Sequence, residues 1–340
     1  MRYGRELPGY PFNAKALLTR CLIVAQRKVW GHWFARFSDF GKPALDWNEE
    51  ETNEHIAEII RSGKPAMIAR FGSNELEATL RGMAVAARRN GTGGRFRDLL
   101  LGRCAPYWWD NSIRGSLGWV AGFFPCDDAS MEAFSARIVR DCANIDVLAS
   151  WLEGEKRMKK SFFSRAFLCG LSDFSYPFRS DHPWYRALEG KRVLVVHPFA
   201  DTIKGQYAHR GNLFPGGRAL PEFELLTYRP VVSLAWNWNN GPFSNWFDAL
   251  DHMIREISER SFDVALIGAG AYGMSLAAAV KKMGRIGIHL GGATQLLFGI
   301  KGGRWDEWDI GKRFYNEHWV RPAASEVPTN ARTVEGGCYW

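Results

Sequence analysis

The sequence lacks paired cysteines, long apolar runs and a leader-like N-terminus. Its 340 residues include six cysteines, which are scattered and form no C-x-x-C pair. Such spacing indicates reduced cysteines, not a disulfide framework or a zinc site. No apolar run approaches the roughly 18 residues that a transmembrane helix needs, and no apolar segment with a small-residue cleavage site opens the chain. These absences predict a cytoplasmic protein without a transmembrane helix or signal peptide.

Acidic residues are outnumbered by basic ones. The chain has 44 Lys and Arg against 36 Asp and Glu, a formal net charge of +8 at pH 7. Positive charge favours an acidic partner: a nucleotide-linked substrate, an anionic membrane surface or nucleic acid. Nucleic acid is not expected, because the chain has no zinc-finger spacing, RNP-like run or long basic block. Aromatic residues are numerous, with 15 Trp and 22 Phe, and such side chains fill cores and line sugar-binding clefts.

The clearest local pattern lies between residues 262 and 299. An apolar run over 262–267 has strand length. Three glycines follow it at G-x-G-x-x-G spacing: Gly268, Gly270 and Gly273. Residues 274–283 then carry apolar positions at helical spacing, and 285–290 form a second strand-like run. Consecutive parallel strands need such a helical crossover. The pattern predicts an α/β fold with a Rossmann-like, mostly parallel sheet flanked by helices.

The glycine-rich turn has two interpretations. Its backbone N–H groups can approach a phosphate, helped by the positive end of the following helix; alternatively, the glycines only permit tight packing of strand against helix. A dinucleotide site also needs a carboxylate about 20 residues further on, and residues 287–292 contain none. We therefore expect a phosphate or nucleotide site that does not serve NAD. Its expected binding residues are Gly268, Gly270, Tyr272, Gly273, His289, Gly291, Gly292, Thr294 and Gln295.

A second polar cluster follows a short strand predicted over residues 66–69. It reads Arg70-Phe71-Gly72-Ser73-Asn74-Glu75 and leads into a helix at 76–81. Polar residues between a strand and a helix lie at the edge of an α/β sheet where ligands bind. Arg70 suits a phosphate, and Glu75 with Asn74 suits a metal or a sugar. The alternative is that Ser73 or Asn74 caps the helix while Glu75 offsets its dipole.

A third strand, expected over residues 191–196, delivers His197 and Asp201 to a loop. We interpret His197 as a general base or phosphate contact, and Asp201 as a base or metal ligand; a structural role for the histidine is the alternative. Other strands are expected at 145–148, 223–226 and 230–234, and helices at 48–62, 127–142 and 246–261. A mobile loop with short helical pieces is expected at 81–103, and aromatic loop with short helix at 161–190.

The two ends of the chain differ from its centre. Residues 1–45 are basic and aromatic, and 14–37 can form a helix with one apolar face. Such a helix suits an anionic membrane surface, here the inner face of the cell membrane. The alternative is packing on the domain or on a second subunit of a homo-oligomer. We expect one α/β domain over residues 46–312 and a tail over 313–340 that packs on it.

Four segments together resemble bacterial glycosyltransferases of the GT-D type, which occur with cell-surface polysaccharide synthesis. They are R-F-G-x-x-E at 70–75, VVHPFADTI at 195–203, LIGAGAYG at 266–273 and IHLGGATQLLFGIKGGRW at 288–305. The ending VEGGCYW is also similar, and the resemblance covers roughly residues 50–340. It implies a nucleotide-sugar donor and a saccharide or lipid-linked acceptor.

The family's first motif reads R-F-G-D-G-E, and its two carboxylates hold a divalent metal against the donor diphosphate. In this chain Ser73 stands in place of the first carboxylate, while Glu75 matches the second. One carboxylate is a poor site for Mg²⁺ or Mn²⁺ unless water and substrate phosphate complete the shell. The resemblance therefore implies either a weakly held metal at Glu75 or metal independence, with Arg70 and the glycine-rich turn supplying positive charge.

As a glycosyltransferase, the chain would use three catalytic candidates. Glu75 contacts a metal or the donor sugar, and Asp201 or His197 activates the acceptor hydroxyl. Trp236, Trp238 and the aromatic stretch 107–124 would form a platform for the acceptor. The alternative is a non-catalytic nucleotide- or saccharide-binding assembly protein of the same fold, which the serine in the metal motif favours. A dehydrogenase is disfavoured by the missing ribose carboxylate.

Overall fold

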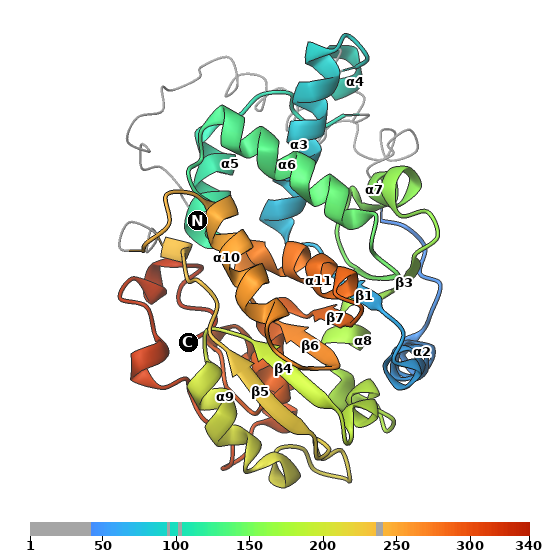
Figure 1. The fold of residues 1–340 in the computed structure, drawn as a ribbon, viewed down its shortest axis with the longest axis vertical. Coiled ribbons are helices and arrows are strands. Elements are labelled where there is room, and N and C mark those ends of the chain that lie inside the picture. The colour runs from blue at the N-terminus through green and yellow to red at the C-terminus, as the bar shows by residue number, and fades with distance from the viewer. Residues whose placement is uncertain (1–41, 94–95, 101–103, 236–240) are drawn as a thin grey trace.

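The computed structural model describes residues 42–93, 96–100, 104–235 and 241–340 (Figure 1). At its centre is a seven-stranded sheet in the order β3-β2-β1-β7-β6-β4-β5, and every strand pair in it is parallel. The predicted Rossmann-like α/β fold is confirmed. The predicted helix over residues 14–37, and with it the membrane contact, lies outside the described residues. No helix in the described ranges is long and apolar enough to cross a membrane.

The strands are short; the five inner ones are almost wholly buried, and the two edge strands are partly exposed. In chain order, the strands are β1 (Ala66–Ala69), β2 (Val147–Ser150), β3 (Phe167–Gly170), β4 (Arg192–Val196), β5 (Glu224–Tyr228), β6 (Val264–Ile267) and β7 (Ile286–His289). Side chains alternate between the two faces of the sheet: in β4, Val193 and Val195 enter one core cluster, and Leu194 and Val196 the other. Both faces are therefore covered, as parallel sheets require.

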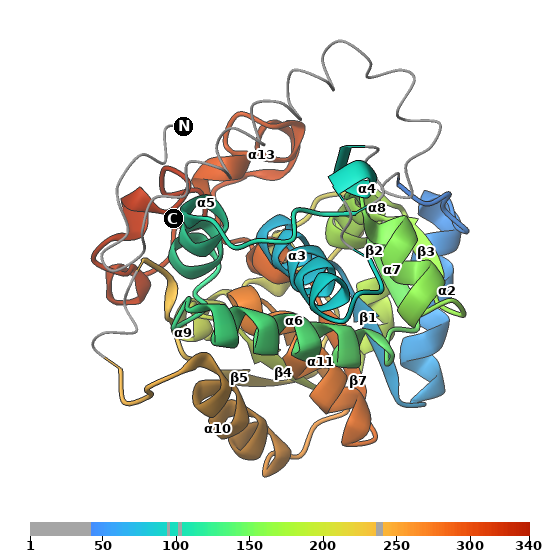
Figure 2. The ribbon, with the colours of Figure 1, turned by 90° about the horizontal axis from the view of Figure 1, so that it is seen from above.

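Two layers of helices enclose the sheet. One face is covered by α3 (Ser73–Arg89), α6 (Asp128–Cys142), α10 (Trp246–Ser258) and α11 (Gly273–Lys282). The other face is covered by α2 (Glu49–Ser62), α9 (Ala200–Tyr207), α12 (Thr294–Leu297) and α13 (Asp309–Phe314). The shorter helices include α4 (Phe96–Leu100), α5 (Asn111–Gly115), α7 (Glu155–Phe162) and α8 (Leu171–Ser175). Figure 2 shows α3 and α6 packed side by side over the sheet.

Local signals set the starts of the longer helices. A capping box joins Asn48 to Glu51 at the start of α2. The carboxylate of Asp127 accepts from the backbone N–H of Ser130 at 2.9 Å and begins α6. The side chain of Asn245 does the same for α10. The predicted helices at 48–62, 127–142 and 246–261 are confirmed within a few residues.

Two local predictions were wrong, and a third was right only in part. Residues 81–103 were expected to be a loop with short helical pieces; α4 is such a piece, but α3 continues unbroken to Arg89. Buried Arg81 holds this continuation through ion pairs to Glu77 at 2.6 Å and to Asp110 at 2.8 Å. No strand forms at 230–234, and the region predicted as loop and helix at 161–190 contains β3. This is an edge strand whose first side chain, Phe167, is 52% exposed.

The strand order creates a crevice at one edge of the sheet. From β4 the chain moves outward to β5 and then returns to β6 on the other side of β4. Ligands of open α/β sheets bind outside the carboxyl ends of the strands where such connections diverge. β7 lies next to β6 and β1 lies next to β7, and all of these strands are parallel, so their carboxyl ends face the same edge.

The last part of the chain packs on the domain. Trp319 is buried, and its indole N–H donates to the carbonyl of Leu213 at 2.8 Å. Glu326 is buried as well, and its carboxylate accepts from the backbone N–H groups of Asp201 and Thr202 at the start of α9. The Glu326 carboxylate from the tail thus caps the N-terminus of α9, where the helix dipole favours an anion.

Candidate functional site

A cavity of about 380 Å³ lies at the carboxyl ends of β1, β4, β6 and β7. Cavities of this size are typical of small-molecule sites. Most of the predicted site residues line it: Arg70, Ser73, Asn74, Glu75, His197, Gly268, Gly270, His289, Gly291, Gly292 and Gln295. Four predicted residues do not: Asp201, Tyr272, Gly273 and Thr294. The sheet therefore brings together side chains that are more than 200 residues apart in the sequence.

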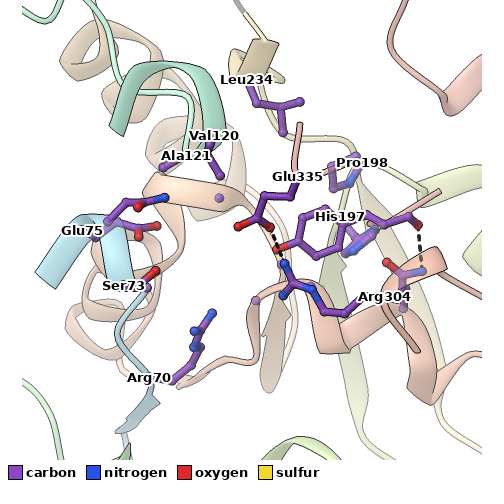
Figure 3. Close-up of a pocket in the computed structure, with 18 of the residues that line it drawn as sticks. Arg70, Ser73, Glu75, Val120, Ala121, His197, Pro198, Leu234, Arg304 and Glu335 are labelled. Atoms are coloured by element: carbon purple, nitrogen blue, oxygen red, sulfur yellow. Dashed lines mark hydrogen bonds and ion pairs between the residues drawn. The ribbon is translucent and has the colours of Figure 1, made fainter. Parts of the chain in front are cut away.

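Arg70 follows β1 and points into the cavity (Figure 3). Its guanidinium carbon lies 5.1 Å from the centre of the Trp151 ring. Its Nε is buried and has no hydrogen-bond partner among the described residues. Burial lowers the pKa of Arg70, and the nearby Glu75 carboxylate opposes that shift; an arginine stays charged in either case. A buried, unpartnered cationic donor at a cavity wall suits an anionic ligand.

The N-terminus of α3 lies beside Arg70. Its N-cap is Gly72, which provides no side-chain hydrogen bond. The alternative that Ser73 or Asn74 caps this helix is therefore wrong. The Glu75 carboxylate instead folds back over Gly72, where an added Cβ would lie 1.9 Å from Glu75 Oε2. Burial raises the pKa of Glu75, and Arg70 opposes the shift. The positive end of a helix thus faces the cavity with a carboxylate beside it.

The glycine-rich turn packs closely on its neighbours. A Cβ at Gly268 would lie 2.6 Å from His197 Cδ2, and one at Gly273 would lie 2.0 Å from His289 Cε1. Gly270 has φ +52°, which favours glycine. The packing interpretation of these glycines is therefore supported at each position. Gly268 and Gly270 still line the cavity.

One backbone donor of the same turn is already satisfied within the protein. The N–H of Ala271 donates to the carbonyl of Ala121 at 3.0 Å. Ala121 follows a π-helical turn, Ser116–Val120, and such turns recur at functional sites. The turn is thus partly covered by residues 120–121, which themselves form a wall of the cavity.

His197 is buried, and its hydrogen bond decides which ring nitrogen carries the proton. Its Nδ1 accepts from the backbone N–H of Phe199 at 3.1 Å. Burial lowers the pKa of His197 to about 3, so the ring is neutral at pH 7. The proton of the neutral ring is therefore on Nε2. His197 offers the cavity a hydrogen-bond donor, and this tautomer does not serve as a general base.

His289 has the opposite arrangement. Its Nδ1 donates to the carbonyl of Ile267 at 3.4 Å, which leaves Nε2 as an acceptor. Burial lowers the pKa of His289 to about 3, and the charge of Arg70 adds to the effect. Two neutral histidines therefore line the cavity, and in the described part of the chain no hydrogen bond is found to the Nε2 of either, which is a donor in His197 and an acceptor in His289.

Asp201 lies on the exposed side of the first turn of α9. Its carboxylate pairs with Arg229 at 2.7 Å and does not line the cavity. Tyr272 is buried on Trp246, with ring centres 5.1 Å apart, and its hydroxyl is 3.1 Å from Ser233 Oγ. These contacts are structural.

Thr294 and Gln295 tie the site together. The Thr294 hydroxyl donates to the carbonyl of Gly291 at 2.8 Å. The Gln295 amide nitrogen donates to the carbonyls of Lys301 and Tyr339, at 3.2 and 3.1 Å. Gln295 therefore joins the loop after β7 to the tail, although it also lines the cavity.

The tail contributes a wall that the sequence analysis did not assign to the site. Glu335, Tyr339 and Trp340 line the cavity together with Arg304. Arg304 pairs with the Glu335 carboxylate and lies 4.8 Å from the centre of the Tyr339 ring. The Tyr339 ring covers Gly292, where a Cβ would lie 2.1 Å from Tyr339 Cε1. The glycine pair in the ending VEGGCYW is a local sequence signal of a tight turn in the tail. Only the fold shows which residues lie next to this turn.

Apolar side chains form another part of the cavity wall, which we call the apolar wall. Its side chains come from the turn at 120–121, the segment at 232–234 and the tail: Val120, Ala121, Val232, Leu234 and Pro328. Of the predicted platform at 107–124, only residues 120 and 121 line the cavity, while the Trp119 indole N–H donates to the carbonyl of Thr333 at 3.1 Å. Trp236 and Trp238 lie outside the described residues.

The donor set does not fit a resident divalent metal. Within the part of the chain that the structure describes, no three side chains of His, Cys, Asp or Glu converge as such a site requires. Glu75 is folded back on its own helix, and Ser73 beside it offers only a hydroxyl.

Comparisons of the chain with protein-family models, curated proteins and solved structures find no match. The functional argument therefore depends on the geometry of the cavity and on the motifs of the sequence.

Proposed function

We propose that the protein is a glycosyltransferase that moves a sugar from a nucleotide-sugar donor to a saccharide or lipid-linked acceptor in bacterial surface polysaccharide synthesis. The observation that carries the proposal is the unpartnered Nε of Arg70 beside the N-terminus of α3, where the N-cap residue Gly72 provides no side-chain hydrogen bond. Both groups suit the diphosphate of such a donor. The resemblance of the motifs to GT-D type glycosyltransferases supports the same function.

In this proposal, each group of residues that lines the cavity has its own role in binding or catalysis. Arg70 and the start of α3 hold the diphosphate and stabilise the negative charge that develops on it as the sugar leaves. Glu75 and Asn74 bind hydroxyl groups of the donor sugar. The neutral rings of His197 and His289 donate and accept hydrogen bonds without adding charge. The apolar wall orients the acceptor, and this alignment lowers the entropy cost of the reaction.

The positive charge at the diphosphate comes from the protein in this proposal. Arg70 supplies a full charge, and the helix N-terminus supplies a partial one. The single carboxylate of Glu75 and the serine at position 73 support recognition without a resident Mn²⁺ or Mg²⁺. A divalent ion would then add little to the affinity for the nucleotide.

The test is isothermal titration of the purified protein with UDP, GDP, CMP and dTDP, each with and without Mn²⁺, and with NAD as a control. We expect one nucleotide to bind in the micromolar range with little effect of Mn²⁺, and NAD not to bind. Tighter binding with Mn²⁺ would show that Glu75 and the phosphates share a metal. The absence of binding by any of the nucleotides would refute the proposal.

A second function is favoured by one observation, the serine at position 73 in place of a metal-binding carboxylate. It is a non-catalytic nucleotide- or saccharide-binding assembly protein of the same fold. Nucleotide binding without turnover of the corresponding nucleotide sugar would favour this alternative.

A further inference from the structure

Two carboxylates line the cavity among the described residues, Glu75 and Glu335. They are close enough that the charge of Glu335 raises the pKa of Glu75. Glu75 is folded back over Gly72 beside the proposed diphosphate site. Glu335 enters from the tail on another side of the cavity, above Arg304 (Figure 3). The two acids therefore have different surroundings and different access to a ligand.

The backbone of Glu335 is in a conformation that non-glycine residues rarely adopt. Its φ is +46°, and the next two residues, Gly336 and Gly337, have φ of +73° and +82°. A left-handed conformation costs a residue with a Cβ roughly 1 kcal/mol or more. The structure around it fixes this conformation: Val334 is buried, and the N–H of Gly337 donates to its carbonyl at 2.8 Å. Strain of this kind is typical of functional positions.

The two oxygens of the Glu335 carboxylate differ. Oε2 accepts from the guanidinium of Arg304 and from the thiol of Cys338. Both of these hydrogen bonds reach Oε2, none is found to Oε1 among the described residues, and the side chain is 35% exposed. Arg304 is itself fixed, because its backbone N–H donates to the carbonyl of Cys338 at 2.9 Å. One oxygen is thus anchored while the other remains free to accept a proton.

The other candidate bases are less suitable. His197 already carries its proton on Nε2, and Asp201 lies outside the cavity in an ion pair with Arg229. His289 offers a free Nε2, but burial lowers its pKa to about 3, which makes it a weak base at neutral pH. Glu75 lies next to Arg70, where the leaving diphosphate is proposed to bind.

We propose that Glu335 is the catalytic base that activates the acceptor. This inference rests on the proposed glycosyltransferase function. The acceptor hydroxyl gives its proton to Glu335 Oε1, and its oxygen forms a bond to the anomeric carbon of the donor sugar. The bond from that carbon to the diphosphate breaks at the same time, and the electron pair leaves with the nucleoside diphosphate beside Arg70. Arg304 holds the carboxylate in position, and a single displacement inverts the anomeric centre.

The experiment uses the full chain with water as the acceptor. The donors are UDP-glucose, GDP-mannose, dTDP-glucose and CMP-N-acetylneuraminate, and released nucleotide is measured for wild type, E335Q, E335D and E317Q. Glu317 is the matched control, since its carboxylate is in the same tail but is 82% exposed and lies 3.6 Å from His318. Nucleotide affinity of each variant is measured by titration, and folding is checked by thermal melting.

For the donor that wild type hydrolyses, we expect E335Q to lower turnover by about 10²- to 10⁴-fold, the usual contribution of a general base. Nucleotide affinity should change by less than about threefold, and E317Q should behave as wild type. E335D should keep part of the activity, because it retains a carboxylate one methylene further back.

Three outcomes would overturn the inference. Equal turnover of E335Q and wild type would show that Glu335 is not the base. A loss of nucleotide affinity as large as the loss of turnover would show that Glu335 only positions Arg304. Wild type that binds nucleotide but hydrolyses none of the four donors would refute catalysis by Glu335 while leaving nucleotide recognition intact; wild type that binds no nucleotide would refute the proposed function itself.

Discussion

Replacement of Arg70 by methionine separates a binding role of this residue from a structural one. Methionine keeps an unbranched apolar stem against Trp151 but removes the buried donor that has no partner. The free protein loses a cation–π contact of about 0.5–1 kcal/mol and is relieved of an unsatisfied group that costs about 1–3 kcal/mol. The two effects oppose each other, so we expect R70M to be no less stable than wild type and at most about 2.5 kcal/mol more stable.

Nucleotide affinity should respond differently. Hydrogen bonds to a charged group contribute about 1.5–3 kcal/mol, so R70M should weaken nucleotide binding by roughly 10- to 150-fold. R81M is the matched control, because the Arg81 side chain is 7% exposed and its ion pairs to Glu77 and Asp110 are complete. R81M should lower stability by about 2–4 kcal/mol and change the affinity of the folded fraction little.

Urea unfolding gives the free energy of unfolding of each variant, and isothermal titration gives its nucleotide affinity. Burial raises the pKa of Glu75, and the charge of Arg70 opposes this shift. Ionisation of Glu75 therefore disfavours folding. The free energy of unfolding falls as the pH rises from the ordinary pKa of a glutamate through the raised pKa of Glu75 in the folded state. R70M should enlarge this fall, since the opposing charge is gone. A loss of more than about 3 kcal/mol at neutral pH with unchanged nucleotide affinity would show that Arg70 is a structural ion and would refute the reasoning.

Three further predictions concern the frame of the site. G273A should lower stability by more than about 3 kcal/mol or prevent folding, because its Cβ would overlap the His289 ring, whereas G205A in α9 has open space and should be stabilising by about 0.5–1 kcal/mol; thermal melts of both variants test this. E326Q should cost about 1–2 kcal/mol in urea unfolding, since it weakens the cap of α9, and a cost no larger than that of an exposed Glu317→Gln would contradict the capping role. In an NMR titration, the rings of His197 and His289 should stay neutral between pH 5 and 8 because burial lowers their pKa values to about 3; a midpoint near 6.5 for either ring would contradict the assigned burial.

Much of the fold could be predicted from local patterns. Residues 262–290 carry a strand, a glycine-rich turn, a helix and a strand, and each signal comes from neighbouring residues. The helix α3 was underestimated because Gly82 and a run of arginines interrupt its pattern. Its continuation depends on distant contacts: a Cβ at Gly82 would lie 2.3 Å from Ser135 Cβ in α6. The edge strand β3 was missed because four residues with an exposed end carry little periodic signal.

The candidate site could be predicted where it follows strand ends. Arg70, His197 and His289 each end or follow a strand, and parallel strands bring such positions to one edge. A position after a strand did not predict where the Asp201 side chain points, because the first turn of α9 directs its carboxylate to Arg229. Glu335 was not assigned a role because nothing near it in sequence predicts its pairing with Arg304. Tautomers of the two histidines also depend on backbone groups that only the fold positions.

The pairing of β1 with β7 has a consequence for folding. Ala66 lies opposite Ile286, so the central ladder joins segments separated by more than 200 residues. Contacts of such high sequence separation form slowly, because a long loop must close before they gain any energy. A chain that has folded β1 to β3 alone leaves the inner edge of β1 open to aggregation until β7 arrives. Because the cavity spans this long-range pairing, ligand binding should report complete folding more stringently than helix content does.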